Sequence, residues 1–598
     1  MPTTRQYRCA DVLRFPMGDG RELIYSKASC SSRVLQTSAV ELLARCQSFQ
    51  TLENHAQALG KEFKLTSTQS TAIKTLLSQL ARKGFLISYE ETLNRIQKTA
   101  DSSDKPPPIA TIGIPTCDRP ELLQRALTSY IENCKEYGRK NDFVVMDDSR
   151  SSNNRRYILG MIRTLSARYK AKILYAGPEE RRVFVKRLVK KGIPQDIAHF
   201  ALFGMPEIGC ATGANRNALL LHTVGDMFLS VDDDTVCRLA SPPQEGESMA
   251  VSSKFDPTEF RFFPNLKTAL HSANFIKGDA LAIHEQLLGK EVGNLFCELP
   301  NTVTSDLNQA TSSFLHKLQY GTGKVATTMC GLIGDCAMSL PHGYLALHDD
   351  SRRQLLSSHL HYKHALSRQV LRAVNRPTIT EGALCLAYAI GLDNRALLPP
   401  FLPVLRNQDG LFGVLLQRCL NRSYFGYLPW AVLHAPQDAR PFALKELREI
   451  PWGIRVSDLF IKLAVSFEMG SGRPDEKLRT FGRYLLDIGS QTSQDFMEFT
   501  RTQIWNTQSQ YIDHLENLLK VHDEKPEFWA RDVKKRLLLL RKAVLKYNVP
   551  LDLMEKREAS EALKCYQRLM LDFGRLLQWW PEIVETAKTL RIQEGIKL

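Results

Sequence analysis

Short apolar runs alternate with helical patterns through the middle of the chain. One helix is expected to begin at Pro120, and another to run from residue 213 towards a turn at Gly225, because apolar residues recur there at helical spacing. Buried strands are expected where the apolar runs are short and continuous, at residues 109–114, 143–146 and 227–231. Polar residues follow each of these strands. The alternation predicts a doubly wound α/β sheet that binds its ligand at the carboxyl ends of its strands.

The first part of the chain has a different pattern. Residues 22–25 and 85–88 read as short strands, and residues 37–46 and 67–83 carry apolar side chains on one stripe of a helix. With a further helix expected between residues 46 and 67, residues 1–92 would contain three helices and a small β element. This combination is typical of a compact winged-helix domain.

A polar stretch that ends in prolines separates this unit from the α/β region. Its sequence, TADSSDKPPP, favours an extended and exposed backbone, so residues 93–108 are predicted to be a linker. The α/β domain is then expected over residues 109–438. Residues 439–598 follow helical patterns interrupted by Pro526 and Pro550, which predicts a helical carboxyl-terminal domain. The helices expected there are residues 496–519, 532–547 and 560–580.

Composition and charge limit the classes of function. The 598 residues are 43% hydrophobic, which is enough for several cores, and no apolar run is long enough for a membrane span. The 13 cysteines form no CxxC pair and no secretory signal pattern follows Met1, so the sequence predicts a soluble protein of the reducing cytoplasm. The net charge of +15 favours anionic partners, which include nucleotides, acidic peptides, nucleic acids and anionic membranes.

Three consecutive aspartates at residues 232–234 follow the predicted strand 227–231. An ordinary acidic turn is one explanation. At the end of a buried strand, however, adjacent carboxylates repel one another and need a compensating cation. Carboxylate oxygens are preferred ligands of hard divalent ions, so the run predicts a site for a metal and a diphosphate. The glycine-punctuated apolar run at residues 325–336 is expected to form a buried loop or wall near this site.

Four motifs in order, IATIGIPTCDRPELLQRAL, FVVMDDS, GANRNALL and FLSVDDD, resemble the GT-A glycosyltransferases of the large inverting family. The resemblance implies transfer of a sugar from a nucleoside diphosphate donor, with inversion at the anomeric carbon. It also implies a nucleoside pocket at the first two strand ends, an Arg-Asn segment over the donor, and a divalent metal, Mn²⁺ or Mg²⁺, on DxD-type aspartates. The donor-binding residues that it implies are Pro115, Thr116, Asp148, Arg216, Asn217 and Asp232.

The same resemblance extends to two later segments. In LRNQDGLFG the family has a Glu-Asp pair at the start of a helix beneath the acceptor, and here the pair is Gln408-Asp409. Asp409 is therefore the implied general base, because one carboxylate is enough for each transfer. In LHAP, His434 follows a family tendency to place a histidine near the metal, while a lone histidine is as often a hydrogen-bonded core residue. The metal ligands implied are Asp232, Asp234 and His434.

In the first unit, the segments YSKASCSSRVLQTSAVELLARC, TLENHAQAL and TAIKTLLSQLARKGFLIS resemble the PqqD-type peptide-recognition domain. Proteins of that family bind the leader of a ribosomally made precursor peptide as an added strand. The resemblance implies that such a peptide is the acceptor. A generic winged helix that binds DNA or serves for packing is the alternative.

These patterns together predict a metal-dependent inverting glycosyltransferase, with two alternatives. A nucleotidyl or phosphosugar transferase also needs a carboxylate-bound metal and a doubly wound sheet, but its first strand is typically followed by a glycine-rich loop that IPTCDRP lacks. A non-catalytic winged-helix protein that binds nucleic acid would use the same basic charge. The presence of Asp148, Asp232, Asp234 and Asp409 argues against a decayed site and makes nucleic acid the less expected partner.

Overall fold

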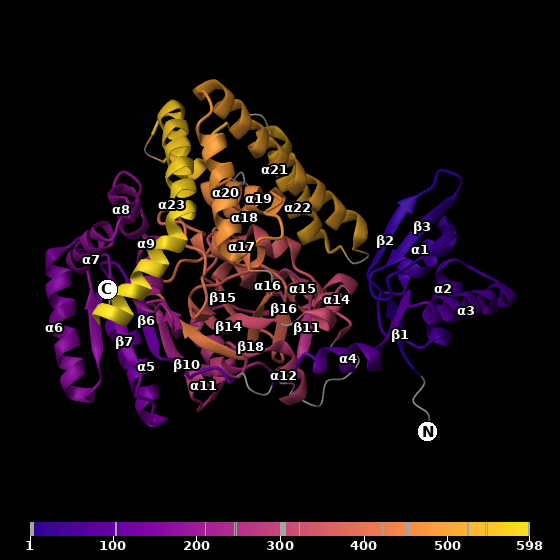
Figure 1. Cartoon of the computed structure of the whole chain (residues 1–598), viewed down its shortest axis with the longest axis horizontal. Helices are drawn as coiled ribbons and strands as arrows, with labels where there is room; N and C mark the ends of the chain where they lie inside the picture. Colours follow the sequence, from indigo (N-terminus) through magenta and orange to yellow (C-terminus); the bar gives the residue numbers. More distant parts are fainter. Residues whose placement is uncertain are drawn as a thin grey trace.

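The chain forms an α/β body with a large mixed sheet, a small amino-terminal unit and a helical carboxyl-terminal region (Figure 1). The computed structural model describes residues 5–101, 105–209, 211–243, 246, 248–298, 307–321, 323–420, 422–448, 454–522, 525–544, 546, 548–555, 557–595 and 598. The predicted linker 93–108 therefore includes residues 102–104, which lie outside the described part.

The mixed sheet at the centre of the body has the strand order β11-β16-β18-β14-β17-β9-β6-β7-β8. Its last four strands are mutually parallel, as in a doubly wound sheet. These strands are β6 (Thr111–Thr116), β7 (Asp142–Asp147), β8 (Ile173–Ala176) and β9 (Met227–Val231). The predicted strands 109–114, 143–146 and 227–231 are confirmed, although the ends of the first two are shifted.

The other half of the sheet departs from the predicted parallel pattern. β17 (Ala389–Asp393) runs antiparallel to both β9 and β14 (Lys324–Asp335). β14 also pairs with β18 (Ser423–His434), in parallel. Residues 325–336, expected to form a buried loop or wall, are therefore mainly a central strand of the sheet. Ladder hydrogen bonds on both sides satisfy its buried backbone. Further strands of the sheet are β10 (Thr235–Ser241), β11 (Ala250–Ser252), β12 (Glu259–Phe263), β13 (Asn274–Ile276), β15 (Gln369–Ala373) and β16 (Thr378–Thr380).

Helices cover both faces of the parallel half. Because side chains alternate along a strand, Phe143 and Val145 of β7 pack in one core while Val144 and Met146 pack in another. The first core includes α5 (Pro120–Glu136) and α6 (Ser152–Tyr169), and the second includes α7 (Pro178–Lys190), α8 (Gln195–Phe203) and α9 (Thr212–His222).

The carboxyl-terminal helices rise from the body in Figure 1 and pack on both of these cores. They include α19 (Val456–Ser466), α20 (Pro474–Gly489), α21 (Ser493–Val521), α22 (Glu527–Ala543) and α23 (Ala559–Glu594). In the part of the chain that the structure describes, no helix combines the length and the apolar character that a membrane crossing needs.

The predicted helix 560–580 is too short, because α23 continues through Pro581. Trp580 is fully buried and donates from Nε1 to the Leu398 carbonyl at 2.7 Å. Ile583 and Ala587 continue the buried face on the far side of the proline. Packing of this face outweighs the cost of a proline inside a helix, about 3 kcal/mol.

Among its described residues, the amino-terminal unit contains the three predicted helices and two small sheets, which confirms the helices and strands predicted for it. The helices are α1 (Thr37–Arg45), α2 (Leu52–Glu62) and α3 (Ser67–Arg82). The predicted strand at 22–25 is the middle strand of an antiparallel sheet made of β2 (Val12–Pro16), β3 (Arg21–Ser26) and β4 (Ser31–Gln36). β1 (Tyr7–Cys9) pairs with β5 (Leu86–Ser88).

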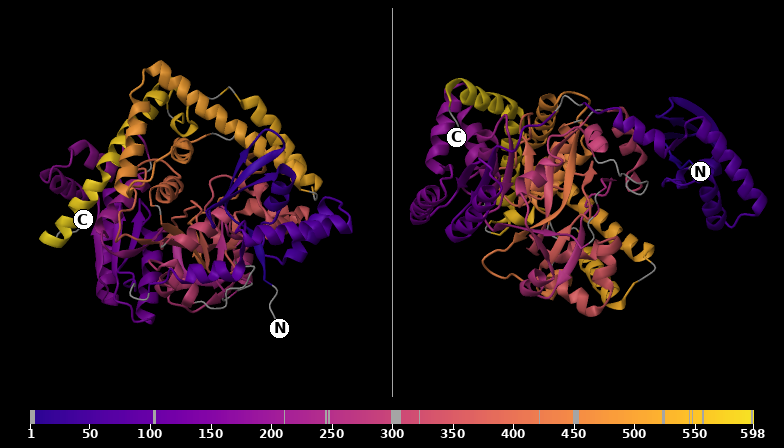
Figure 2. Two further views of the ribbon diagram at one scale, coloured as in Figure 1. Left: turned by 45° about the vertical axis from the view of Figure 1, so that its right-hand side comes forward. Right: turned by 90° about the horizontal axis from the view of Figure 1, so that it is seen from below.

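This unit is packed against the body (Figure 2). The buried Arg8 guanidinium donates to the Leu307 carbonyl at 3.3 Å, and the Phe49 N–H donates to Asn308 Oδ1 at 2.7 Å. The Phe49 ring belongs to the core that α5 and α6 share with the sheet. The first part of the predicted linker is also structured, as the end of helix α4 (Tyr89–Gln97). Contacts within one core therefore join the unit to the body.

The first turn of α9 lies directly against the segment that precedes residue 408. A Cβ atom on Gly213 would lie only 1.8 Å from the Leu402 carbonyl oxygen. The Ala214 N–H donates to the Pro403 carbonyl at 3.0 Å. Glycine at position 213 permits this contact between two backbones, which brings two distant segments of the chain together.

We expect Gly213→Ala to lower the free energy of unfolding by about 1–3 kcal/mol, because the new methyl group overlaps a backbone that cannot move independently. Gly160→Ala is the matched control: it lies within α6 and its Cβ would meet no atom within 4 Å. That substitution should stabilise the protein by about 0.5–1 kcal/mol, since alanine is the better helix former. Urea unfolding measures both, and equal effects of the two substitutions would contradict the close contact.

Candidate functional site

A cavity of about 860 Å³ opens at the carboxyl ends of β6, β7 and β9. Segments from the whole body line it, including the first turn of α17 (Gln408–Cys419) and the end of β18. Of the residues expected at the site, it brings together Pro115, Thr116, Asp148, Arg216, Asp232, Asp234, Asp409 and His434. These residues, which are distant in sequence, therefore line one cavity.

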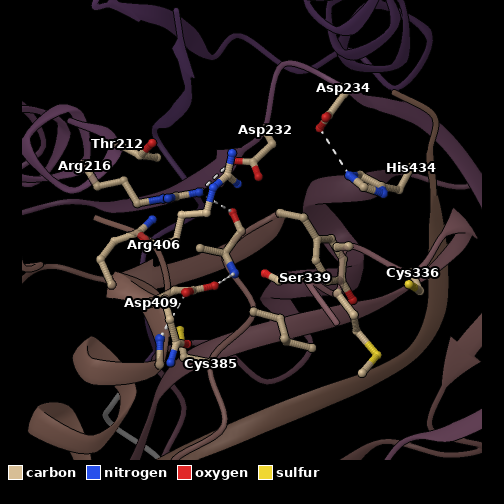
Figure 3. Close-up of a pocket in the computed structure, with 18 of the residues that line it drawn as sticks. Thr212, Arg216, Asp232, Asp234, Cys336, Ser339, Cys385, Arg406, Asp409 and His434 are labelled. Carbon is tan, nitrogen blue, oxygen red and sulfur yellow. Dashed lines mark hydrogen bonds and ion pairs between the residues drawn. The ribbon is translucent and has the colours of Figure 1, made fainter. Parts of the chain in front are cut away.

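The first two aspartates of the run have separate partners. Arg216 of α9 donates from Nη2 to Asp232 Oδ1 at 2.6 Å (Figure 3). Thr116 Oγ1 donates to Asp233 Oδ2 at 2.8 Å, and Arg119 Nη1 approaches Asp233 Oδ1 at 3.2 Å. Adjacent carboxylates repel one another, and here each of the two is stabilised by its own cation or hydrogen-bond donor.

Burial affects the protonation of both carboxyls. Desolvation, reinforced by the neighbouring Asp234, raises the pKa of Asp233 to about 7. The Asp232 side chain is 32% exposed to the cavity, but the surrounding protein still desolvates it and raises its pKa, against the opposing charge of Arg216. A ligand cation near these groups would therefore favour their ionised forms.

Asp234 pairs with His434 from the far end of β18. His434 Nε2 lies 3.3 Å from Asp234 Oδ1, and Nδ1 lies 2.8 Å from the Asp335 carbonyl oxygen (Figure 3). Burial disfavours charge on the imidazole, but the hydrogen bond to Asp234 and its charge outweigh burial and raise the pKa of His434 to about 9. Burial also acts to raise the pKa of Asp234, yet the hydrogen bond from His434 and its charge hold it below the usual value.

The arrangement of these groups bears on the predicted metal ligands. Asp232 points to Arg216, while Asp234 and His434 face each other, so only two of the three expected ligands lie together. Within the described ranges, no group of three or more histidine, cysteine or acidic side chains is placed to hold a metal. The hydrogen bond of His434 Nδ1 to a carbonyl is nevertheless the usual support for a ligating histidine, because it directs Nε2 outwards.

Asp148 directly follows β7 and is bound by a buried arginine. Arg181 of α7 is fully buried and donates from Nη2 to Asp148 Oδ1 at 2.8 Å and to the Asp147 carbonyl at 3.1 Å. Two other basic residues of this helix, Arg182 and Lys186, are exposed. Arg181, one residue earlier, points inwards. Helical spacing alone did not distinguish it from its exposed neighbours.

Asp409 lies in the first turn of α17, as the resemblance implied for the start of a helix. Its Oδ2 accepts from the Ala387 N–H at 3.3 Å and its Oδ1 from its neighbour Gly410 N–H at 3.1 Å (Figure 3). Both contacts come from backbone donors, which hold the carboxylate in one orientation. Gln408, which stands where the family has a glutamate, is buried.

Asn217 does not line the cavity. Its Nδ2 donates to the Ala201 and Phe401 carbonyls at 3.1 and 3.0 Å, and its Oδ1 accepts from the Phe401 N–H at 2.8 Å. The expected donor contact is therefore replaced by a structural one. Asn215, two residues earlier, lines the cavity instead and joins β6 to β7 through the Thr116 and Met146 carbonyls. The Asn-Arg-Asn sequence did not reveal which asparagine points inwards.

Comparison of the chain with models of protein families found no match, and a search of curated proteins found none with significant similarity.

We expect Asn217→Ala to lower the free energy of unfolding by about 1–3 kcal/mol, because it leaves buried backbone groups at Phe401 and Ala201 unpaired. Asn153→Ala on the exposed face of α6 is the control and should change stability by less than about 0.5 kcal/mol. Urea unfolding measures both variants. Unchanged stability of Asn217→Ala, with loss of nucleotide binding, would restore the donor-binding role that the resemblance implied.

Proposed function

We propose that the protein is an inverting glycosyltransferase that moves a sugar from a nucleoside diphosphate donor to an acceptor. The observation that carries this proposal is the single cavity shared by Asp148, Arg216, Asp234 and Asp409. Those residues come from four separate segments of the chain. Asp148 would accept a hydrogen bond from the nucleobase, Arg216 would contact phosphate, Asp234 would bind the metal and Asp409 would be the general base. We also propose that the mixed sheet is a GT-A fold, because the carboxyl ends of its parallel strands carry this cavity.

A divalent metal, Mn²⁺ or Mg²⁺, fits this cavity if the donor completes its coordination. Asp234 and His434 would hold it, since magnesium in particular is often bound by one or two protein ligands together with substrate phosphates. The bound ion would offset the negative charge that develops on the departing diphosphate. Arg216, held by Asp232, adds a second positive charge to the lining of the cavity.

Asp409 is the proposed general base. In an inverting transfer the acceptor nucleophile bonds to the anomeric carbon as the bond from that carbon to the diphosphate oxygen breaks. The nucleophile must lose its proton in this step, and Asp409 would accept it on a carboxylate oxygen. The two backbone N–H groups at the carboxylate fix its orientation without supplying a cation that would weaken it as a base.

The acceptor that we propose is a ribosomally made precursor peptide, with the amino-terminal unit as a PqqD-like winged-helix domain that binds it. Support comes from the three-stranded sheet of this unit, whose edge strands are β2 and β4. Leu13, Phe15 and Val34 on these strands are exposed, at 42%, 49% and 41%. Edge strands with exposed apolar side chains suit a peptide that is added as a further strand.

Asp409→Asn should lower turnover by about 10²–10⁴-fold while donor binding changes little, because a base acts on the acceptor proton. Asp438→Asn, which removes an exposed carboxylate outside the cavity lining, is the matched control and should leave turnover unchanged. Single-turnover kinetics and calorimetric binding of nucleoside diphosphates measure the two effects separately. Equal losses of donor affinity and turnover would place Asp409 in the donor site.

Asp234→Asn should weaken Mn²⁺ binding by more than about tenfold, since loss of even a supporting residue costs about 10–100-fold. Asp233→Asn is the control, because Asp233 is bound to Thr116 and Arg119 and not to His434. A metal at His434 must displace a proton below the pKa of about 9, so affinity should rise with pH towards that value. Titrations followed by electron paramagnetic resonance test this, and identical Mn²⁺ affinities for the two variants would remove the metal assignment.

A further inference from the structure

We infer that Arg406, together with Arg216, forms a two-arginine clamp that contacts the diphosphate of the donor. The inference rests on the proposed function, because it assigns a residue to the donor in the same cavity. Arg406 immediately precedes the Asn407-Gln408-Asp409 segment, and Figure 3 shows its side chain on the same side of the cavity as Arg216. No sequence motif singled it out.

The backbone around Arg406 has an unusual conformation. Leu405 has a φ of 69° and Asn407 a φ of 63°, so both neighbours of Arg406 are left-handed although neither is glycine. This region costs a non-glycine residue about 1 kcal/mol or more, and it is especially uncommon for a bulky side chain such as leucine. The surrounding structure must therefore hold the segment in place, as is typical of functional sites.

Two groups of contacts hold it. On the side of α19, Ser457 Oγ donates to the Arg406 carbonyl at 3.0 Å and Asn407 Nδ2 donates to Asp458 Oδ1 at 3.2 Å. On the side of α9, Asn217 is bound to both backbone groups of Phe401. The helix that carries Arg216 is thus attached to the segment that carries Arg406.

The charge of Arg406 is available to a ligand. Two other arginines of the cavity are neutralised: Arg368 binds Asp335 through two nitrogens, and Arg372 binds Asp256 at 2.7 Å. Arg406 is exposed to the cavity and, among the residues that the structure describes, forms no ion pair. Its charge is therefore not offset at the place where the proposed donor brings two phosphates.

Guanidinium groups suit this ligand because their planar N–H groups match pairs of phosphate oxygens. Breaking the bond to the anomeric carbon leaves an electron pair, and with it negative charge, on the diphosphate oxygen. Arg216 is partly neutralised by Asp232, so the additional positive charge that stabilises this oxygen comes from Arg406. Arg406 would then touch the leaving group and qualify as a catalytic residue.

The test is calorimetric binding of inorganic pyrophosphate, and of uridine, guanosine and adenosine diphosphates, to the full-length protein. We expect Arg406→Gln to weaken binding by about 10–100-fold, the value of a charge-assisted hydrogen bond, and Arg406→Lys to weaken it less. Arg163→Gln is the matched control, because Arg163 is exposed on α6 outside the cavity and its loss removes the same overall charge. It should bind like the wild type at physiological salt.

The outcomes separate this inference from the proposed function. If the wild type binds a nucleoside diphosphate and Arg406→Gln binds it equally tightly, the clamp is wrong and the proposed function stands. If the wild type binds neither pyrophosphate nor any of the three nucleotides, both are wrong. Equal weakening by Arg163→Gln would show that overall charge, and not Arg406, determines the affinity. Thermal unfolding of each variant without ligand verifies that the fold is intact.

Discussion

The compensation of negative charge at the end of β9 is the constraint on which the site depends. Three adjacent carboxylates are buried or partly buried there, and repulsion among them is relieved by partners from different elements. Arg216 comes from the helix before the strand, while His434 comes from a strand end some 200 residues later. The antiparallel strands β17 and β10 connect these segments within one sheet. The strand order of the sheet therefore determines which side chains compensate the aspartates at its edge.

Much of the parallel half of the sheet could be predicted from the sequence, because continuous apolar runs such as residues 227–231 leave few alternatives to a buried strand. The location of most site residues followed from those strand ends. What could not be predicted depends on tertiary contacts. Asn217 and Asn215 are chemically identical, and only the packing of α9 decides which one lines the cavity. In the same way, continuation of α23 through Pro581 depends on the buried Trp580.

The unpredicted half of the sheet shows a different limit. β14 and β18 are long, glycine-containing strands that are buried on both faces, so their sequences lack the alternation that marks a half-exposed strand. Glycines in an apolar run favour a loop, whereas Gly331 and Gly334 allow neighbouring backbones to approach closely. The sequence of a fully buried strand contains little information about its partners, and the pairing of β14 with β18 could only be observed.

The attachment of the amino-terminal unit to the body has a consequence for any substrate that uses both. Arg8 and Phe49 fix the unit on the body through buried contacts, so its distance from the cavity does not vary as it would on a flexible tether. A peptide anchored on this unit would therefore have to span a constant distance to the cavity. Only a residue at a suitable number of positions from the anchor could reach Asp409, and the choice of modified residue would follow from chain length.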